Sequence, residues 1–161
     1  MGRKIIFSLA DFGANAVDVT PNYYKTIVGT SRGLWNNATN LVSEGNYGFL
    51  SPVSGLLTGA IINIDNSNHS QLSFSGKVYE VGSWTPVSTS NANTNANGIT
   101  YLAFHTPLRV QAGQVVSLYC PPNITHYSGK KGDVDTYTNG IIDYDTPRCF
   151  QLNFIIETAN T

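Results

Sequence analysis

The chain has 161 residues, of which 41% are hydrophobic and 12% are charged, with a formal net charge of -1. This length predicts a single domain, spanning 1–161, that is large enough to bury its own core. The charged share is about half of the usual one, and there is no excess of Lys or Arg to neutralise phosphates, so nucleic acids and anionic membranes are not expected as partners.

The first residues do not match a targeting segment. Two cations precede a short apolar run, but Asp11 ends that run well before the length of a signal-peptide core. No stretch of about 18 apolar residues occurs, so no membrane span is expected. With no export signal recognised, Cys120 and Cys149 are expected to be buried free thiols, and a disulfide between them is the alternative.

Apolar and polar residues alternate with period two along most of the chain, which predicts β-strands, and helical periodicity is nearly absent. The alternation is clearest in Gln71–Val81 and in Cys149–Glu157. The candidate strands are, in chain order, 4–9, 23–28, 33–36, 47–50, 56–65, 71–81, 100–110, 115–120, 136–144 and 149–157.

Polar segments separate these strands. Ser88–Gly98 consists almost entirely of Ser, Thr, Asn and Ala, so it has little apolar surface to bury and is expected to be an exposed, mobile loop. Pro121–Gly132 is a second long loop. Eight to ten strands in a chain of this size are most economically arranged as an all-β, antiparallel β-sandwich of jelly-roll type.

Three short segments share a pattern with a known family. Gly48-Phe49 is followed by Pro52, Gly55 and an apolar strand, Pro107–Tyr119 contains a Gly-Gln turn before Val115, and Phe150–Ile156 forms a last apolar strand. The segments resemble those of the globular heads of complement-type and tumour-necrosis-factor-like jelly rolls, although Gln114 stands where an acid is common. The resemblance implies a homotrimer that packs apolar side chains along a threefold axis and binds a partner through exposed loops.

The segment Leu56–Ile64 is apolar on both faces, whereas a strand with one face in water alternates cleanly. The alternation places Leu57 and Ile61 on one face and Ile62 on the other. We expect one face to fill the core and the other to meet a neighbouring subunit, so Leu57, Ile61 and Ile62 are the candidate interface residues.

Two kinds of binding site are candidates. Asp133 and Asp135 place carboxylates at alternating positions, which suits calcium, although the spacing is not that of an EF-hand and solvated turn acids are the alternative. Trp84 stands at a strand end, where an exposed indole would stack on a sugar or a protein, or a buried one would close the sandwich. Tyr127 and Lys130 are candidates for the same kind of ligand-binding tip.

No catalytic signature is present. His69, His105 and His126 are far apart, and no Gly-x-Ser-x-Gly or phosphate-binding loop accompanies them. We therefore expect a non-enzymatic virion or phage structural protein, either a capsid decoration or a receptor-binding tip, that assembles as a homotrimer and is found in the virion or is extracellular after lysis. The alternative is a carbohydrate-binding lectin module of similar fold. No cofactor other than calcium is expected.

Overall fold

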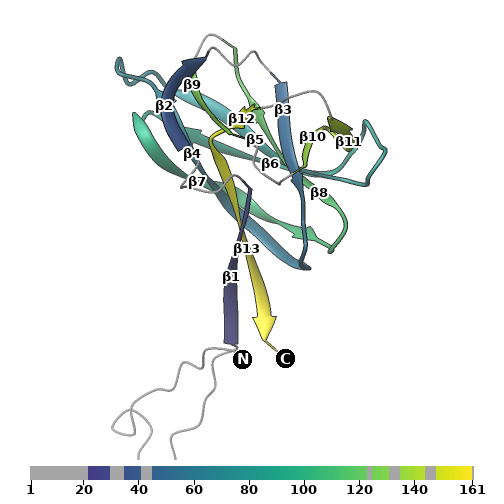
Figure 1. Ribbon diagram of the computed structural model, residues 1–161. Coiled ribbons are helices and arrows are strands. Elements are labelled where there is room, and N and C mark those ends of the chain that lie inside the picture. The colour runs from purple at the N-terminus through teal and green to yellow at the C-terminus, as the bar shows by residue number, and fades with distance from the viewer. Residues whose placement is uncertain are drawn as a thin grey trace, which may run out of the picture.

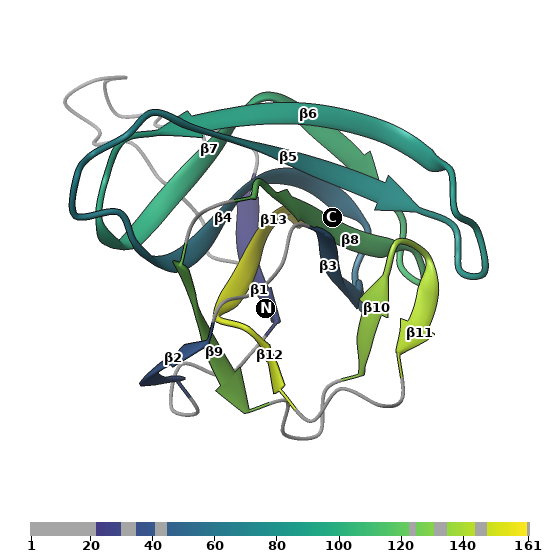
Figure 2. The ribbon, with the colours of Figure 1, turned by 90° about the horizontal axis from the view of Figure 1, so that it is seen from above.

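The computed structural model of the protein describes residues 22–29, 35–40, 45–122, 125–130, 135–143 and 148–160. In these ranges the chain forms thirteen strands and no helix, and the strands make two antiparallel sheets that pack face to face (Figure 1 and Figure 2). The predicted class, an all-β antiparallel sandwich of jelly-roll type, is confirmed, with more strands than expected. No helix within the described residues is long and apolar enough to cross a membrane.

The first sheet is built around one long central strand, β4 (Gly55–Asp65). In the described part of the chain the other strands of this sheet are β1 (Asn22–Gly29), β13 (Leu152–Asn160), β7 (Gly98–Val110), β9 (Thr125–Lys130), β2 (Trp35–Asn40) and β12 (Arg148–Phe150). Strand β13 lies between β1 and β4, and β7 lies along the other edge of β4. Strands β1 and β13 pair along the whole of β1, from Asn22 with Asn160 to Gly29 with Asn153.

The second sheet covers the inner face of the first. Among the described residues its strands are, in spatial order, β11 (Ile141–Asp143), β10 (Thr136–Thr138), β3 (Gly45–Leu50), β8 (Val115–Cys120), β5 (Leu72–Tyr79) and β6 (Pro86–Thr94). Strands β10 and β11 form a hairpin around Asn139-Gly140, and Tyr137 joins this hairpin to Gly48 of β3. The hairpin therefore extends the second sheet beyond β3.

Four strands of each sheet make up the jelly roll. The order β1-β13-β4-β7 faces the order β3-β8-β5-β6. The chain crosses between the sheets from β3 to β4, from β4 to β5, from β6 to β7 and from β7 to β8, which is the interleaved order of two Greek keys. Strands β9 to β12 are an insertion between β8 and β13.

The core fills the space between the two sheets with side chains that alternate inward along each strand. Phe49 of β3 and Phe154 of β13 meet edge to face, with ring centroids 6.2 Å apart and an angle of 69° between the rings. Such aromatic pairs add to the stabilisation that comes from burial, which is about 1.5–3 kcal/mol for each large apolar side chain. Strand β4 contributes Leu57, Ala60, Ile62 and Ile64, all fully buried.

The prediction of a mobile loop near 88–98 is wrong, because residues 86–94 form strand β6. Small side chains alternate along β6, so that Ser90 and Ala92 are buried while Asn91 and Asn93 face outward. The Ser75 and Ser73 hydroxyls of β5 donate to Oδ1 of Asn91 and Asn93 at 2.9 and 2.8 Å. Side-chain hydrogen bonds thus replace the apolar cross-strand pairs that usually identify a strand.

Two other predictions of local structure need correction, and a third concerns residues outside the described ranges. The range 136–144 is a hairpin rather than one strand, and the expected loop 121–132 contains β9. The first candidate strand, 4–9, lies outside the described residues. Cys120 is buried and free, as expected, whereas the side chain of Cys149 lies outside the described residues.

Candidate functional site

The outward side chains of four strands of the first sheet form an apolar surface, which we call the apolar face. Its members are Ile27, Leu56, Ile61, Ile99, Tyr101, Ala103 and Ile155. The register aligns Ile27 with Ile155, and it aligns Ile61 with Tyr101 on the neighbouring strand. Ile27, Ile99 and Tyr101 are 54%, 56% and 54% exposed, so large apolar side chains of β1 and β7 project into solvent.

A β-bulge in β4 decides which residues reach the apolar face. Ile155 pairs with Gly59 and Ile156 with Leu57, so Thr58 is an extra residue on β4. Beyond the bulge the alternation is reversed, and Leu57 points into the core together with Ile62. The expectation that Leu57 shares a face with Ile61 is therefore wrong. Leu57 and Ile62, two of the three candidate interface residues, are both fully buried in the core, whereas Leu56 is 39% exposed.

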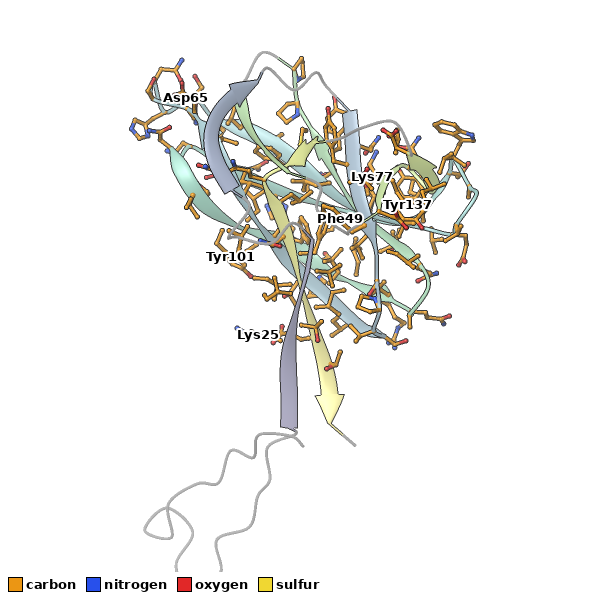
Figure 3. All side chains as sticks on the ribbon, viewed as in Figure 1. Lys25, Phe49, Asp65, Lys77, Tyr101 and Tyr137 are labelled. Carbon is orange, nitrogen blue, oxygen red and sulfur yellow. The ribbon has the colours of Figure 1, made fainter. Side chains whose placement is uncertain are left out.

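The Tyr101 ring reaches over Gly59, which lies two residues before its register partner Ile61 on β4 and has no side chain. A Cβ atom added at Gly59 would stand 2.8 Å from both Cε1 and Oη of Tyr101. The ring therefore covers Gly59 rather than standing away from the strand. Figure 3 shows Tyr101 and Lys25 on one side of the molecule, and Lys77 and Tyr137 of the second sheet on the other.

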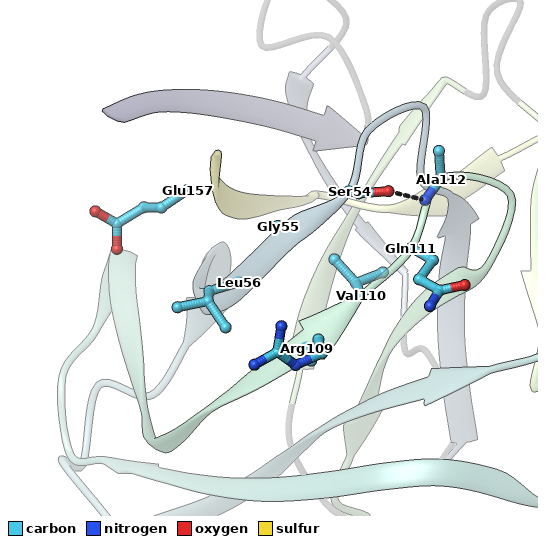
Figure 4. A pocket seen from close by; sticks show the side chains of 8 residues that line it. All are labelled: Ser54, Gly55, Leu56, Arg109, Val110, Gln111, Ala112 and Glu157. Carbon is cyan, nitrogen blue, oxygen red and sulfur yellow. Dashed lines mark hydrogen bonds between the residues drawn. The ribbon is translucent and has the colours of Figure 1, made fainter. Parts of the chain in front are cut away.

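A charged row ends the apolar face near the turn into β4. Lys25 pairs with Glu157, Glu157 with Leu56, and Leu56 with Arg109. Three charges that alternate in sign thus lie on β1, β13 and β7, with the uncharged Leu56 of β4 between the last two. Beside this row lies a pocket of about 530 Å³, shown in Figure 4. Its lining residues are Ser54, Gly55, Leu56, Arg109, Val110, Gln111, Ala112 and Glu157.

The pocket is lined by apolar, polar and charged groups, and a hydrogen bond joins the two turns at its edge. The Ser54 hydroxyl accepts a hydrogen bond of 2.8 Å from the backbone N–H of Ala112, which ties the β3–β4 turn to the β7–β8 turn. Leu56 lies between the positive Arg109 and the negative Glu157.

The outer face of the second sheet has a different character. Besides the Ser–Asn pairs of β5 and β6, the Lys77 ammonium lies 5.4 Å from the ring centroid of Tyr119. Next to these polar groups is a small apolar cluster of Tyr79, Val115 and Tyr137, against which Ile142 packs. Burial raises the pKa of the Tyr79 phenol. The two outer faces of the sandwich are therefore unlike, one apolar and one mainly polar.

Trp84 lies in the turn between β5 and β6 and is 65% exposed. The alternative in which the indole closes the end of the sandwich is thus wrong. The turn itself is well tied: Ser83 N–H donates to the Glu80 carbonyl at 3.1 Å, and Thr85 N–H donates to Oγ of Ser83 at 3.1 Å. The hairpin tip at Gly140 holds it from the other side, because Gly82 N–H donates to the Gly140 carbonyl at 2.7 Å and Gly140 N–H donates to the Ser83 carbonyl at 2.9 Å.

The other candidate ligand-binding residues are not next to Trp84. Tyr127 and Lys130 belong to β9, which lies in the first sheet, on the other side of the sandwich from the β5–β6 turn (Figure 2). The side chains of both residues lie outside the described residues. The two candidate ligand-binding places, the Trp84 turn and the segment with Tyr127 and Lys130, therefore lie in different sheets.

The calcium site stays a prediction. Asp135 is exposed just before β10, and Asp133 lies outside the described residues. In the part of the chain that the structure describes, no group of three His, Cys, Asp or Glu side chains is placed to hold a metal ion.

Sequence reasoning missed the docking of the β10–β11 hairpin onto the Trp84 turn. The signal was present, because Asn139-Gly140 between two short alternating runs is a typical two-residue hairpin connection, and Asn139 has a φ of 55°.

The arrangement as a whole offers two contact surfaces, the apolar face and the exposed indole. No protein-family model matches this chain, and no curated protein and no solved structure matches it either.

Proposed function

We propose that this chain is a non-enzymatic structural protein of a virus or phage particle, and that it assembles as a homotrimer through the apolar face. The observation that carries the proposal is the apolar face, where large apolar side chains of four neighbouring strands lie on the outer side of the first sheet. Ile62 and Phe154 fill the core, while Ile61 and Ile155 lie on the outer side of the same strands. A sheet with one face in water would carry polar residues at those outward positions.

A second copy of the chain is the occupant that this face fits best. Monomeric proteins rarely expose wide contiguous apolar surface, and such surface is typical of permanent subunit contacts. The charged row of Lys25, Glu157 and Arg109 alternates in sign at the end of the apolar face, so a second copy can offset each charge with an opposite one. The number of three subunits comes from the resemblance to trimeric jelly-roll heads.

The assignment to a particle rests on composition. A 12% charged share and many Asn, Ser and Thr residues give a polar, nearly neutral surface, which suits a protein that packs against many copies of its neighbours. In this proposal the partners are other virion proteins and a cell-surface receptor or glycan, and the chain is located in the virion. The carbohydrate-binding alternative rests on a different observation, the exposed indole of Trp84.

The assembly is tested by light scattering and sedimentation over a range of concentrations. The wild type should have the mass of three chains, and Ile61→Asp and Ile27→Asp should shift it to one chain, because a charge buried at an interface costs several kcal/mol. Thr89→Asp, on the outer face of the second sheet, is the matched control and should leave the mass unchanged. A strictly monomeric wild type would contradict the assembly. Absence of the chain from gradient-purified particles of its source, probed by immunogold labelling, would contradict the virion assignment.

A further inference from the structure

We propose that the turn carrying Trp84 is a binding site for a sugar ring of a neutral glycan, with the indole as the stacking platform. Trp84 has the highest exposed fraction of the large apolar residues described, at 65%. Tryptophan is usually among the more buried residue types, and an exposed indole leaves a large apolar surface in water. A ligand that covers this ring would remove the unfavourable exposure.

The site is formed before the ligand arrives. The two chain neighbours of Trp84 are both fixed: Ser83 by its bonds to Glu80 and Gly140, and Thr85 by its N–H bond to Oγ of Ser83. The Ser83 hydroxyl also donates to the Thr85 carbonyl at 3.2 Å. An anchored backbone loses little conformational freedom on binding, so more of the contact free energy remains as affinity. The exposure of the indole is therefore a property of an ordered turn.

The charges around the turn favour a neutral ligand. No Lys or Arg occurs between Tyr79 and Val87, so nothing in the turn pairs with a phosphate, a sulfate or a sugar carboxylate. Its one acid, Glu80, accepts a hydrogen bond of 2.6 Å from Nε2 of Gln114 and is engaged there. Single-stranded nucleic acids also stack on tryptophan, but they need a cationic groove along the backbone. The hydroxyl of Thr85, the residue after Trp84, is exposed, has no partner among the described residues and is available to a ligand hydroxyl.

The size of the exposed surface favours a small ligand. A stable protein interface buries about 800 Å² on each partner. Apart from the indole, the turn and the start of β6 expose only Val81 and Val87 as large apolar side chains, at 55% and 58%. The outer face of β5 and β6 beyond them is a row of Ser and Asn side chains that bond to one another. A pyranose ring, with an apolar C–H face and a rim of hydroxyls, suits a turn that offers one exposed indole and one free hydroxyl.

The site and the proposed assembly are separate in the fold. Trp84 belongs to the second sheet, and the apolar face belongs to the first. If the trimer forms, three such turns on one assembly would bind a branched or surface-bound glycan more tightly than a free sugar through multivalency.

The test is a screen of neutral and sialylated glycans, followed by titration of the wild type with the neutral glycan that binds best. Trp84→Ala should weaken binding about tenfold or more, as expected for a stacking residue at the centre of a site. Trp84→Phe, which keeps a smaller ring, should weaken it less. Thr89→Ala, farther along β6, is the control and should bind as the wild type does. Because Trp84 is exposed, all three variants should melt like the wild type.

Three results would overturn the glycan site: no glycan binds at millimolar concentration, binding is unchanged in Trp84→Ala, or Trp84 is required for binding to phosphatidylcholine vesicles and not to glycans. The assembly proposal is judged apart from these results. Ile61→Asp should keep the wild-type affinity for a free monosaccharide and lose only the gain on a multivalent surface.

Discussion

The ring of Phe104 lies directly against the backbone of Gly76, across the gap between the two sheets. A Cβ atom added at Gly76 would be 2.5 Å from Cζ of Phe104 and 2.7 Å from its Cε2. Phe104 lies in the part of β7 that leaves its pairing with β4, between Ala103 and Leu108, and it is 5% exposed. The absence of a side chain at 76 thus makes room for the largest core residue of β7.

Gly76→Ala should therefore destabilise the fold, because the new methyl group must displace the Phe104 ring. Overpacking of this kind costs about 1–3 kcal/mol. Urea denaturation of the single variant and of Gly76→Ala with Phe104→Leu measures the effect. The smaller side chain should relieve part of the clash, so the two changes together should cost less than the sum of their separate effects. Additive costs would show that the two residues are not in contact.

Two serines of β6 make a matched pair. The Ser90 hydroxyl accepts a hydrogen bond of 2.8 Å from Thr106 N–H, where β7 leaves β4, whereas Oγ of Ser88 is buried with no partner among the described residues. Ser90→Ala should lower the free energy of unfolding by about 1–2 kcal/mol, because it leaves a backbone donor unpaired. Ser88→Ala should change it by less than about 0.5 kcal/mol or raise it. Thermal or urea melts that rank the two variants in the opposite order would contradict the prediction.

Stability should fall at alkaline pH because of Cys120. Burial raises the pKa of this thiol well above its ordinary value. The unfolded thiol ionises near pH 8.5, about where a free cysteine does. Below that pH both states keep the proton; above it only the unfolded state loses it, so the free energy of unfolding falls by up to about 1.4 kcal/mol per pH unit.

Urea denaturation of the wild type and of Cys120→Ala, between about pH 7.5 and about pH 9.5, isolates this effect from that of Cys149. The difference in stability between the two proteins should shrink as the pH rises. In the native wild type Cys120 should also react slowly with thiol reagents, because it is fully buried. A pH-independent difference would show that the thiol is not shielded.

The fold class could be predicted because most strands carry a strong apolar alternation. Strand β8 was predicted with its observed ends, Val115 and Cys120, and β4 within one residue at its start. Strand β6 could not be predicted in this way. Its inward residues, Ser90 and Ala92, are too small to give an apolar signal, and its pairing depends on hydroxyl and amide groups of β5 that lie far away in sequence.

The candidate site was predictable in part. The apolar character of both sides of β4 was visible in the sequence, but the assignment of residues to sides was not, because one bulge at Thr58 reverses the alternation of Leu56 and Leu57. A bulge depends on the pairing of two strands and leaves no pattern in either one alone. The anchoring of the Trp84 turn depends likewise on the hairpin at Gly140, which lies 56 residues after Trp84 in the chain.

The pairing of β1 with β13 has a mechanical consequence. Asn22 and Asn160 are partners at one end of this pair, so the first residue of β1 and the last residue of β13 lie side by side, as Figure 1 shows. A force that pulls these two ends apart loads one cross-strand pair at a time, and the strands peel open in sequence. A force applied to one end against the body of the sandwich instead loads all eight pairs together. The pair of strands should therefore resist tension along its length far better than separation of Asn22 from Asn160.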